Sequence, residues 1–314
     1  MADLRKCAVI GVGFVGATAA FTLADSGLFS EIVLLDANRK KAEGEAADIS
    51  HGIAFSQPCV VRAGDYVDLA GCGLIIIAAG ANQKPGETRI ELLGRNKAIL
   101  KSIIEQITPV NRDAILLVVS NPVDILTYMA QKLSGLPTGR VIGSGTVLDT
   151  ARLKHLLGQH LHVDSRNVHA FIIGEHGDSE LAVWSSANIS GVDLNDYCRI
   201  CGKDDSRAAM DQIYYSVRDA AYKIIEGKGA TYYAIGLAVR RIAEAIVRDE
   251  HSVLPVSSMV SGHYGISGLC LGMPCILGSD GVQDILDIPL SEDEMAQLQS
   301  SAKKMRALLD EIGM

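Results

Sequence analysis

The sequence predicts an α/β fold, in which a doubly wound parallel sheet is followed by an α+β domain. In the first half, short β-branched runs alternate with longer helical patterns, as in βαβ units. Runs such as LIIIAAG, residues 74–80, do not alternate apolar with polar side chains, which is typical of strands covered by helices on both faces. After about Gly145, longer helical patterns surround shorter strand-like pieces. We therefore expect one domain at residues 1–145 and a second at residues 146–314.

The individual elements follow from these patterns. The first half contains candidate strands at residues 7–11, 31–36, 59–64, 74–80, 114–120 and 140–145. The second half contains helical patterns at residues 206–226 and 230–248 and strand-like pieces at residues 168–174, 181–191 and 270–278. Near the end, Ser291 and Glu294 have the spacing of a capping box, and residues 295–309 carry apolar side chains at helical spacing. We expect a closing surface helix there.

The composition argues against nucleic-acid and membrane partners. The 37 acidic residues outnumber the 29 basic ones, whereas a nucleic-acid surface needs a basic stripe. No segment approaches the ~20 apolar residues that span a bilayer. The seven cysteines are an odd number in a chain of 314 residues, unlike the disulfide framework of a small secreted domain. We expect reduced thiols and a cytoplasmic protein.

A glycine fingerprint stands between the first candidate strand and a helical pattern. The run AVIGVGFVGATAA places Gly11, Gly13 and Gly16 in G-x-G-x-x-G spacing. These glycines permit a tight turn, the approach of a pyrophosphate and close packing of helix on strand. Asp36 ends the next strand, 20 residues after Gly16, where a carboxylate accepts hydrogen bonds from a ribose and repels a 2′-phosphate. The segment predicts a Rossmann-type domain that binds NAD.

Four further segments carry polar side chains suited to catalysis. GANQKPGETR (80–89) and VVSNPVD (118–124) follow the fourth and fifth strands, whose carboxyl ends form the usual ligand edge of such sheets. VLDTAR (147–152) places Asp149 and Arg152 three residues apart, on one face of a helix. GEHGDSE (174–180) places His176 among carboxylates directly after an apolar run.

These four segments, in this order behind the glycine fingerprint, resemble the L-lactate and malate dehydrogenase family, and the fit to its bacterial L-lactate dehydrogenases is close. The resemblance runs from about Cys7 to the C-terminus, and the four motifs together are far more specific than any one alone. It implies an NAD-dependent oxidoreductase that interconverts pyruvate and L-lactate, a reaction of glycolysis and fermentation.

The resemblance also implies catalytic and substrate-binding roles. His176 is similar to the family's proton donor and acceptor, and Asp149 to the carboxylate that orients it. Arg152 resembles the clamp on the substrate carboxylate, since a planar guanidinium binds a carboxylate through two hydrogen bonds. Arg89, on a loop that closes, would polarise the substrate carbonyl. The further substrate-binding residues implied are Gln83, Asn121, Asp124 and Thr231.

The same matching implies a larger set of residues that contact NAD. They are Gly11, Gly13, Val15, Gly16, Asp36, Lys41, Tyr66, Gly80, Ala81, Ser102, Val119, Asn121, Ser144 and Ile235. No metal site is expected. His155, His160 and His162 lack a convincing carboxylate shell, and Cys198 and Cys201 form an isolated pair.

Three other functions remain as alternatives. A malate dehydrogenase of the same family would carry arginine in place of Gln83, because the second carboxylate of oxaloacetate is costly to bury unpaired. Lys84 is adjacent and positive, but the run QKPGE is usual in the lactate dehydrogenases, so we expect pyruvate. An NAD-using glycoside hydrolase would need a divalent metal. A nucleotide-sensing module without catalysis would have no use for His176, Asp149 and Arg152.

The family resemblance implies a homotetramer and raises the question of an effector. Many bacterial relatives are activated by fructose 1,6-bisphosphate through an arginine and a histidine at a subunit interface. His169 matches the histidine, but Lys154 stands at the arginine position. Lysine keeps the positive charge and loses the two-pronged phosphate geometry. The sequence therefore leaves activation open.

Overall fold

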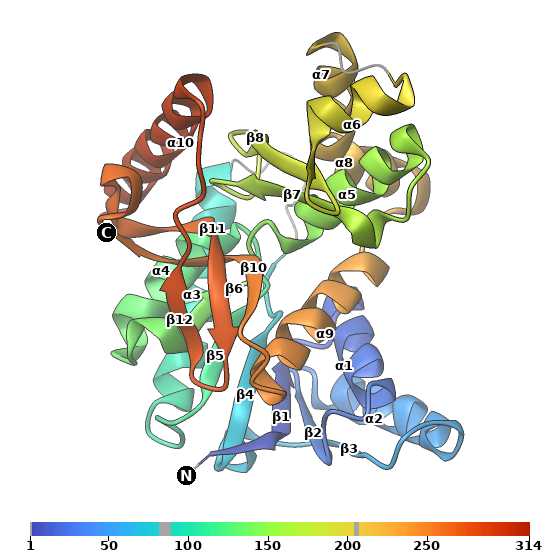
Figure 1. The fold of residues 1–314 in the computed structure, drawn as a ribbon. Coiled ribbons are helices and arrows are strands. Elements are labelled where there is room, and N and C mark those ends of the chain that lie inside the picture. Colours follow the sequence, from blue (N-terminus) through green and yellow to red (C-terminus); the bar gives the residue numbers. More distant parts are fainter. Residues whose placement is uncertain (1, 82–88, 204–206) are drawn as a thin grey trace.

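The protein, seen here as a computed structural model, is described at residues 2–81, 89–203 and 207–314, with backbone alone at residues 89 and 90. Within these residues one sheet has the strand order β12-β11-β10-β6-β5-β4-β1-β2-β3 (Figure 1). Strands β1 to β6 pair with one another in parallel, as the doubly wound prediction requires. Their bounds are Asp3–Ile10 for β1, Glu31–Leu35 for β2, Val60–Ala63 for β3, Cys72–Ile77 for β4, Ile115–Val118 for β5 and Val141–Gly143 for β6.

Helices cover both faces of this parallel part. Figure 1 shows α1, α2 and α9 on one side of the sheet and α3 and α4 on the other. Helices on both faces are the physical reason for the unbroken apolar runs of the buried strands. These helices span Phe14–Asp25 (α1), Arg39–Gly52 (α2), Arg89–Ile107 (α3), Val123–Ser134 (α4) and Tyr233–Val247 (α9).

The second half adds strands to the same sheet and builds a smaller one. Strands β10 (Ser252–Ser261), β11 (Ser267–Gly278) and β12 (Gly281–Ile285) run antiparallel, and β10 pairs with β6. Strands β7 (Val168–Ile173), β8 (Leu181–Ile189) and β9 (Val192–Asp193) form a separate antiparallel sheet. The remaining helices are α5 (Val147–Leu161), α6 (Leu194–Cys201), α7 (Arg207–Arg218), α8 (Ala220–Lys228) and α10 (Glu292–Glu311). The predicted fold class, a parallel α/β sheet followed by an α+β part, is confirmed.

One expectation about the second half is wrong, and one strand was missed. The helical pattern at residues 206–226 corresponds to two helices, since α7 ends at Arg218 and α8 begins at Ala220. Between them Asp219, with φ −86° and ψ −4°, stays in the right-handed helical region and the apolar spacing continues, so the pattern alone does not show the break. Strand β10 has no counterpart among the expected elements; pairing with β6 and β11 imposes a strand on a segment that contains serines and Pro255.

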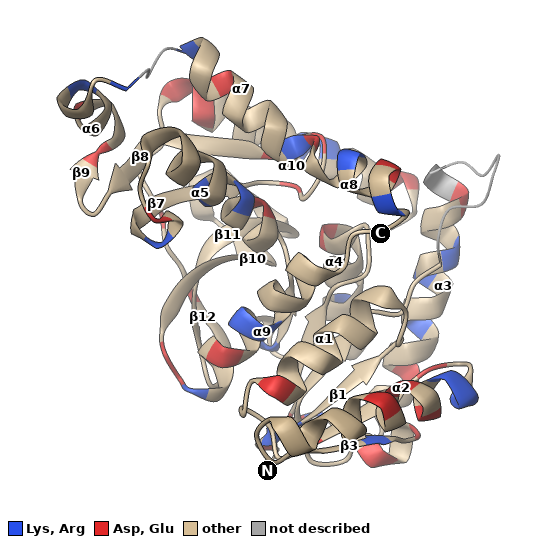
Figure 2. Cartoon of the chain, turned by 90° about the vertical axis from the view of Figure 1, so that its right-hand side faces the viewer, with Lys and Arg blue, Asp and Glu red and all other residues tan. Residues whose placement is uncertain are grey.

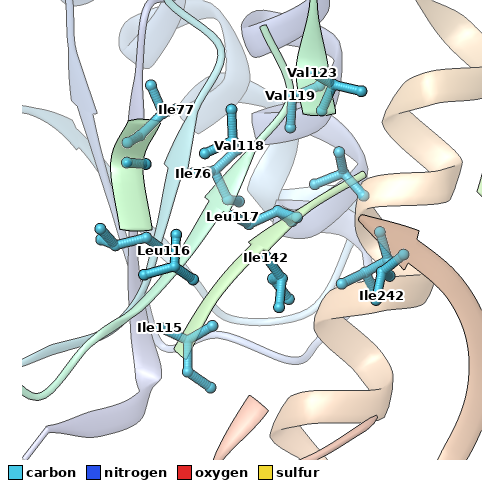
Figure 3. Close-up of a cluster of buried hydrophobic side chains, with 14 of the residues drawn as sticks. Ile76, Ile77, Ile115, Leu116, Leu117, Val118, Val119, Val123, Ile142 and Ile242 are labelled. Atoms are coloured by element: carbon cyan, nitrogen blue, oxygen red, sulfur yellow. The ribbon is translucent and has the colours of Figure 1, made fainter. Parts of the chain in front are cut away.

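One hydrophobic core joins strands from both sides of residue 145. Ile76, Leu117 and Ile142 from the parallel strands lie in the same buried cluster as Ile242 of α9 (Figure 3). Val256 of β10 belongs to this cluster as well. A division of the chain after residue 145 therefore does not divide the core.

The parallel strands bring their carboxyl ends to one edge of the sheet. Backbone hydrogen bonds of 2.7 to 2.9 Å connect the residues just beyond β1, β4, β5 and β6 to the neighbouring strands. Gly11, Asp36, Gly80, Val119 and Ser144 all follow strands of this edge. Residues far apart in the sequence thus meet where open α/β sheets bind their ligands.

The closing helix begins as predicted. Ser291 caps α10 and Glu294 completes the capping box, while the Glu294 carboxylate also accepts hydrogen bonds from the backbone of Trp184 and Ser185. Figure 2, which shows the right-hand side of the view in Figure 1, has basic and acidic residues interspersed over the helices. Of the helices in the described ranges, none has the length and apolar character needed to cross a bilayer.

We expect the core to set the stability of the fold. Ile76 is completely buried, so Ile76→Ala should lower the free energy of unfolding by about 2 to 5 kcal/mol, and Ile76→Val by about 0.5 to 1.5 kcal/mol. Phe55 is 93 % exposed, so Phe55→Ala should change the free energy of unfolding by about 0.5 kcal/mol or less. Urea denaturation measures all three, and equal effects of Ile76→Ala and Phe55→Ala would contradict this view of the core.

Candidate active site

The glycine turn after β1 has the geometry of a pyrophosphate cradle. Gly11 has a φ of 91°, and a Cβ there would lie 2.4 Å from the backbone of Ala79. A Cβ on Gly16 would lie 1.9 Å from the carbonyl oxygen of Gly11. Gly13, the N-cap residue of α1, has no side chain that could cap the helix, and the space where a Cβ would lie is open. The first N–H groups of α1 are therefore left for an anion, as dinucleotide binding requires.

Asp36 lies against this turn. One carboxylate oxygen accepts a hydrogen bond of 2.9 Å from the backbone N–H of Val12, and the other accepts one of 2.9 Å from Asn38. The contact fixes the acid at the end of β2 beside the glycines. This is the position where a ribose would meet a carboxylate, so the residues present fit an NAD molecule.

Helix α5 and strand β7 bring Asp149 to His176. Thr146, the N-cap residue of α5, and Thr150 on α5 both hydrogen-bond the backbone of Ile172 near the end of β7, which fixes the helix against the strand. His176 lies in the β7–β8 connection, and its Nδ1 is 2.6 Å from Oδ2 of Asp149. The sequence motifs predicted both residues, and the fold places them in direct contact.

Charge at this pair favours a protonated imidazole. Burial opposes the charged form of His176, but the Asp149 carboxylate outweighs it and raises the pKa of the imidazole to about 9. Burial also raises the pKa of Asp149, yet the positive charges of His176 and Arg152 hold it below its usual value. Arg152 donates to Oδ1 of Asp149 at 2.8 Å. The carboxylate thus lies between two cations.

Two residues beyond β5, Asp124 and Asn121, take part in hydrogen bonds that position the segments around His176. Asp124 is 2 % exposed, and its Oδ2 accepts a hydrogen bond of 2.7 Å from the backbone N–H of His176. Burial raises the pKa of Asp124 to about 6. The backbone oxygen of Asn121 accepts from the Asn96 amide at 2.9 Å, and the Asn96 oxygen accepts from Ala81 at 2.8 Å. Asn96 therefore ties the segments after β4 and β5 together.

A cavity of about 310 Å³ opens beside His176. Residues of α3, α4, α8, α10, the segment after β5 and the β7–β8 connection line it, together with the residue after α10: Leu92, Leu93, Asn121, Pro122, Ile125, Glu175, His176, Gly177, Asp178, Tyr222, Leu308, Glu311 and Ile312. Since Nδ1 of His176 is engaged by Asp149, the other ring nitrogen is the one left for a ligand in the cavity. A small organic acid fits such a volume.

The β7–β8 connection is anchored to the main sheet. Gly174 and Gly272 of β11 exchange two backbone hydrogen bonds of 2.9 Å. The backbone N–H of Glu175 donates to the Ser301 hydroxyl of α10 at 2.9 Å. These bonds hold the histidine loop against the sheet that carries the glycine turn.

Other predicted site residues occupy varied positions. Gln83 lies outside the described residues, and for Arg89 the structure gives only its place as the first residue of α3. Thr231 precedes α9, and Ile235 lies on it, partly buried against the core. Lys154 is partly buried on α5, where burial lowers its pKa, and His169 is exposed on β7. The remaining expected cofactor contacts are Val15 on α1, Lys41 on α2, Tyr66 beyond β3, Gly80 and Ala81 beyond β4, Ser102 on α3, Val119 beyond β5 and Ser144 beyond β6.

Sequence reasoning missed several residues of the site. Asn96, Tyr222 and Leu308 come from helices whose amphipathic patterns do not reveal which side chains face a cavity. Glu180 is buried beside Asp149 and His176, with one potential ligand atom from each of the three within 4.8 Å of the others. Its place in the run GDSE was visible, but its burial was not.

Comparison with known proteins assigns the chain to a family. Residues 5–143 match the model of the lactate/malate dehydrogenase NAD binding domain, and residues 146–313 match that of the lactate/malate dehydrogenase alpha/beta C-terminal domain. The chain belongs to the lactate/malate dehydrogenase family.

Curated members of this family are close in sequence. The chain is 54 % identical to an L-lactate dehydrogenase of Acetivibrio thermocellus, over 98 % of this chain and 96 % of the relative. It is 55 % identical to L-lactate dehydrogenase 1 of Clostridium acetobutylicum, over 98 % of each. The predicted resemblance to bacterial L-lactate dehydrogenases and the NAD-dependent oxidoreductase class are confirmed.

Solved structures of the family share the whole fold. A lactate dehydrogenase from a Medee basin deep-sea metagenome library aligns with a TM-score of 0.96 at 47 % identity, over 100 % of both chains. The minor L-lactate dehydrogenase of Enterococcus mundtii, in a ligands-bound form, aligns with a TM-score of 0.96 at 40 % identity, over 99 % of both. The NAD cofactor is confirmed by the matching NAD binding domain.

We expect the Asp149 carboxylate to hold the proton on His176. Asp149→Asn removes the negative charge, so the pKa of the imidazole should fall from about 9 towards its usual value or below. NMR titration of ¹⁵N-histidine-labelled protein measures it. In the parent, this raised pKa contributes stability that is present below pH ~6.5 and is lost as pH rises through about 9. An unchanged His176 titration in Asp149→Asn would contradict the assignment.

Proposed function

We propose that this chain interconverts pyruvate and L-lactate with His176 as the proton donor and acceptor. The observation that carries the proposal is the 2.6 Å contact between His176 Nδ1 and buried Asp149, beside a cavity sized for a small organic acid. When bound, NADH supplies the hydride for the carbonyl carbon. The chain's own residues then have to bind the substrate and deliver a proton to its oxygen.

His176 is suited to that proton transfer. Because its Nδ1 proton is directed to Asp149, the proton on Nε2 is the one available to the substrate oxygen. As the imidazolium gives up this proton, the negative charge that develops on the substrate oxygen is neutralised and the ring becomes a neutral imidazole. In lactate oxidation, Nε2 takes the hydroxyl proton back, and the Asp149 carboxylate stabilises the imidazolium that forms.

Arg152 and Asn121 orient the substrate in this proposal. The Arg152 guanidinium is 15 % exposed and uses Nη1 on Asp149, which leaves further N–H donors for the substrate carboxylate. Asn121 lines the cavity and can donate to the reacting oxygen. Arg89 is assigned the polarising role from the sequence resemblance, Thr231 the pocket wall, and Asp124 a position beneath His176.

We assign a monocarboxylate substrate. Among the described residues that line the cavity, the charged groups other than His176 are Glu175, Asp178 and Glu311, all acidic. A second substrate carboxylate would meet like charges there, which disfavours oxaloacetate. Gln83, neutral in the sequence, supports the same choice.

For the cofactor we assign NAD in preference to NADP. The Asp36 carboxylate is fixed beside the glycine turn by the backbone of Val12 and Asn38. A 2′-phosphate would meet this negative charge, whereas a ribose hydroxyl can donate to it. The residues proposed to contact NAD are those expected from the sequence, from Gly11 to Ile235.

Exposed apolar surface and the state of the cysteines bear on assembly and location. We propose a cytoplasmic homotetramer. Phe21 on α1 and Tyr233 and Leu237 on α9 are 57 to 65 % exposed on two helices that pack together, which is apolar surface that another subunit would cover. All seven cysteines lie within the described residues and none forms a disulfide there, as in a reducing compartment. Fructose 1,6-bisphosphate is proposed as an effector to be tested at Lys154 and His169.

Replacing the proposed acid should abolish most of the activity. His176→Ala should lower kcat/KM for pyruvate with NADH by about 10²- to 10⁴-fold, because proton transfer then depends on water. The matched control is His155→Ala, since His155 is exposed on α5 and lies apart from the cavity lining. Circular dichroism checks that both variants fold. A His176→Ala enzyme as active as the control would remove the proposal.

Substrate choice should depend on position 83. Gln83→Arg adds a partner for a second carboxylate, so the ratio of kcat/KM for oxaloacetate to that for pyruvate should rise by about tenfold or more. Lys84→Gln is the control, and it should leave this ratio low. A parent enzyme that prefers oxaloacetate would show instead that the chain is a malate dehydrogenase.

A further inference from the structure

Glu180 is a buried carboxyl group that the mechanism above does not use. It precedes β8, is 5 % exposed, and its Oε1 has no hydrogen-bond partner among the described residues. Its backbone is held on both sides, since its N–H donates to Gly177 at 3.2 Å and its carbonyl accepts from the Tyr214 hydroxyl at 2.5 Å. The side chain is therefore placed by the fold.

The charges that act on Glu180 come from each element around it. Asp149 and Arg152 belong to α5, His176 to the β7–β8 connection, and Arg218 and Tyr214 to α7. Carboxylate oxygens of Glu180 and Asp149 and a ring nitrogen of His176 lie within 4.8 Å of one another. Arg152 is already bonded to Asp149, so the cluster contains a fixed positive charge, which disfavours a metal ion as its purpose.

A carboxyl group in this position lowers the stability of the fold at neutral pH. Burial, with the neighbouring Asp149 charge, raises its pKa to about 8, and its buried Oε1 lacks a hydrogen bond. Glutamine would fill the same space without a charge. An acid that is costly to bury, next to the catalytic pair, points to a role in the chemistry.

We propose that Glu180 is a positioning residue for the catalytic proton, a carboxylate that acts with Asp149 and Asp124 to hold this proton on His176 as the pH rises. This inference rests on the proposed function of His176. It involves no new bond: when Glu180 loses its proton to solvent, its negative charge stabilises the imidazolium in addition to Asp149. His176 then keeps the proton needed for pyruvate reduction over a wider pH range.

The test compares Glu180→Gln with the parent over pH 6 to 10. The alkaline decline of kcat/KM for pyruvate should move to lower pH by about half a unit or more in Glu180→Gln, since one of the three negative charges near the imidazole is gone and those of Asp149 and Asp124 remain. The pKa of His176 in cofactor-free protein, measured by ¹⁵N NMR, should shift in the same direction. Glu180→Asp keeps the charge and should retain much of the parent profile.

Thermal melts separate this role from a purely structural one. A folded-state pKa raised above the unfolded value means that stability is full at low pH and falls as pH rises from ~4.5 to about 8. Glu180→Gln removes this fall, so its melting temperature at pH 8.5 should exceed that of the parent. A purely structural role of Glu180 predicts a melting temperature of Glu180→Gln below that of the parent at this pH. Tyr214→Phe, which removes the contact to the Glu180 backbone and keeps the carboxyl group, is the control for packing.

The outcomes are distinct. Superposable pH profiles and His176 titrations in parent and Glu180→Gln would overturn this inference and leave the proposed function in place. A parent without pyruvate reductase activity would overturn the proposed function. If Glu180→Gln does not fold, the role is overturned unless Glu180→Asp folds and keeps the parent pH profile.

Discussion

The hydrogen bond between His176 and Asp149 is the interaction on which the rest of the site depends. It fixes which ring nitrogen faces the cavity, and it supplies the negative charge that overcomes the cost of burying an imidazolium. The neighbouring groups can be understood from it. Arg152 compensates the Asp149 charge, and Asp124 holds the backbone of the histidine. Without the pair, these buried polar groups would be a cost to folding with no compensating function.

Much of the fold and site could be predicted because the decisive signals are local. The spacing of Gly11, Gly13 and Gly16 is set by sterics within one turn, and the structure shows the close backbone contacts that require Gly11 and Gly16. Apolar runs identify buried parallel strands for the same reason. Family resemblance added the pairing of Asp149 with His176, which spacing could not show.

What the sequence could not show depends on contacts between distant segments. Residues 252–261 form strand β10 because β6 and β11 pair with them, and no local pattern in this serine-containing segment predicts a strand. Glu180 is an ordinary glutamate in the sequence, and it becomes unusual only when α5 and α7 enclose it. The cavity wall formed by α10 likewise follows from docking of a helix whose own pattern indicates only an amphipathic surface helix.

The pair of backbone hydrogen bonds between Gly174 and Gly272 affects how the histidine loop is held relative to the main sheet. It fastens the histidine loop to β11, and β11 is continuous through β10 and β6 with the strands that end at the glycine turn. Backbone hydrogen bonds thus connect His176, the proposed acid, to the sheet edge proposed to bind the cofactor, so their relative placement follows from the folding of one sheet. The side chains around the cavity are then the parts that can vary to suit a bulkier substrate while this backbone pairing is kept.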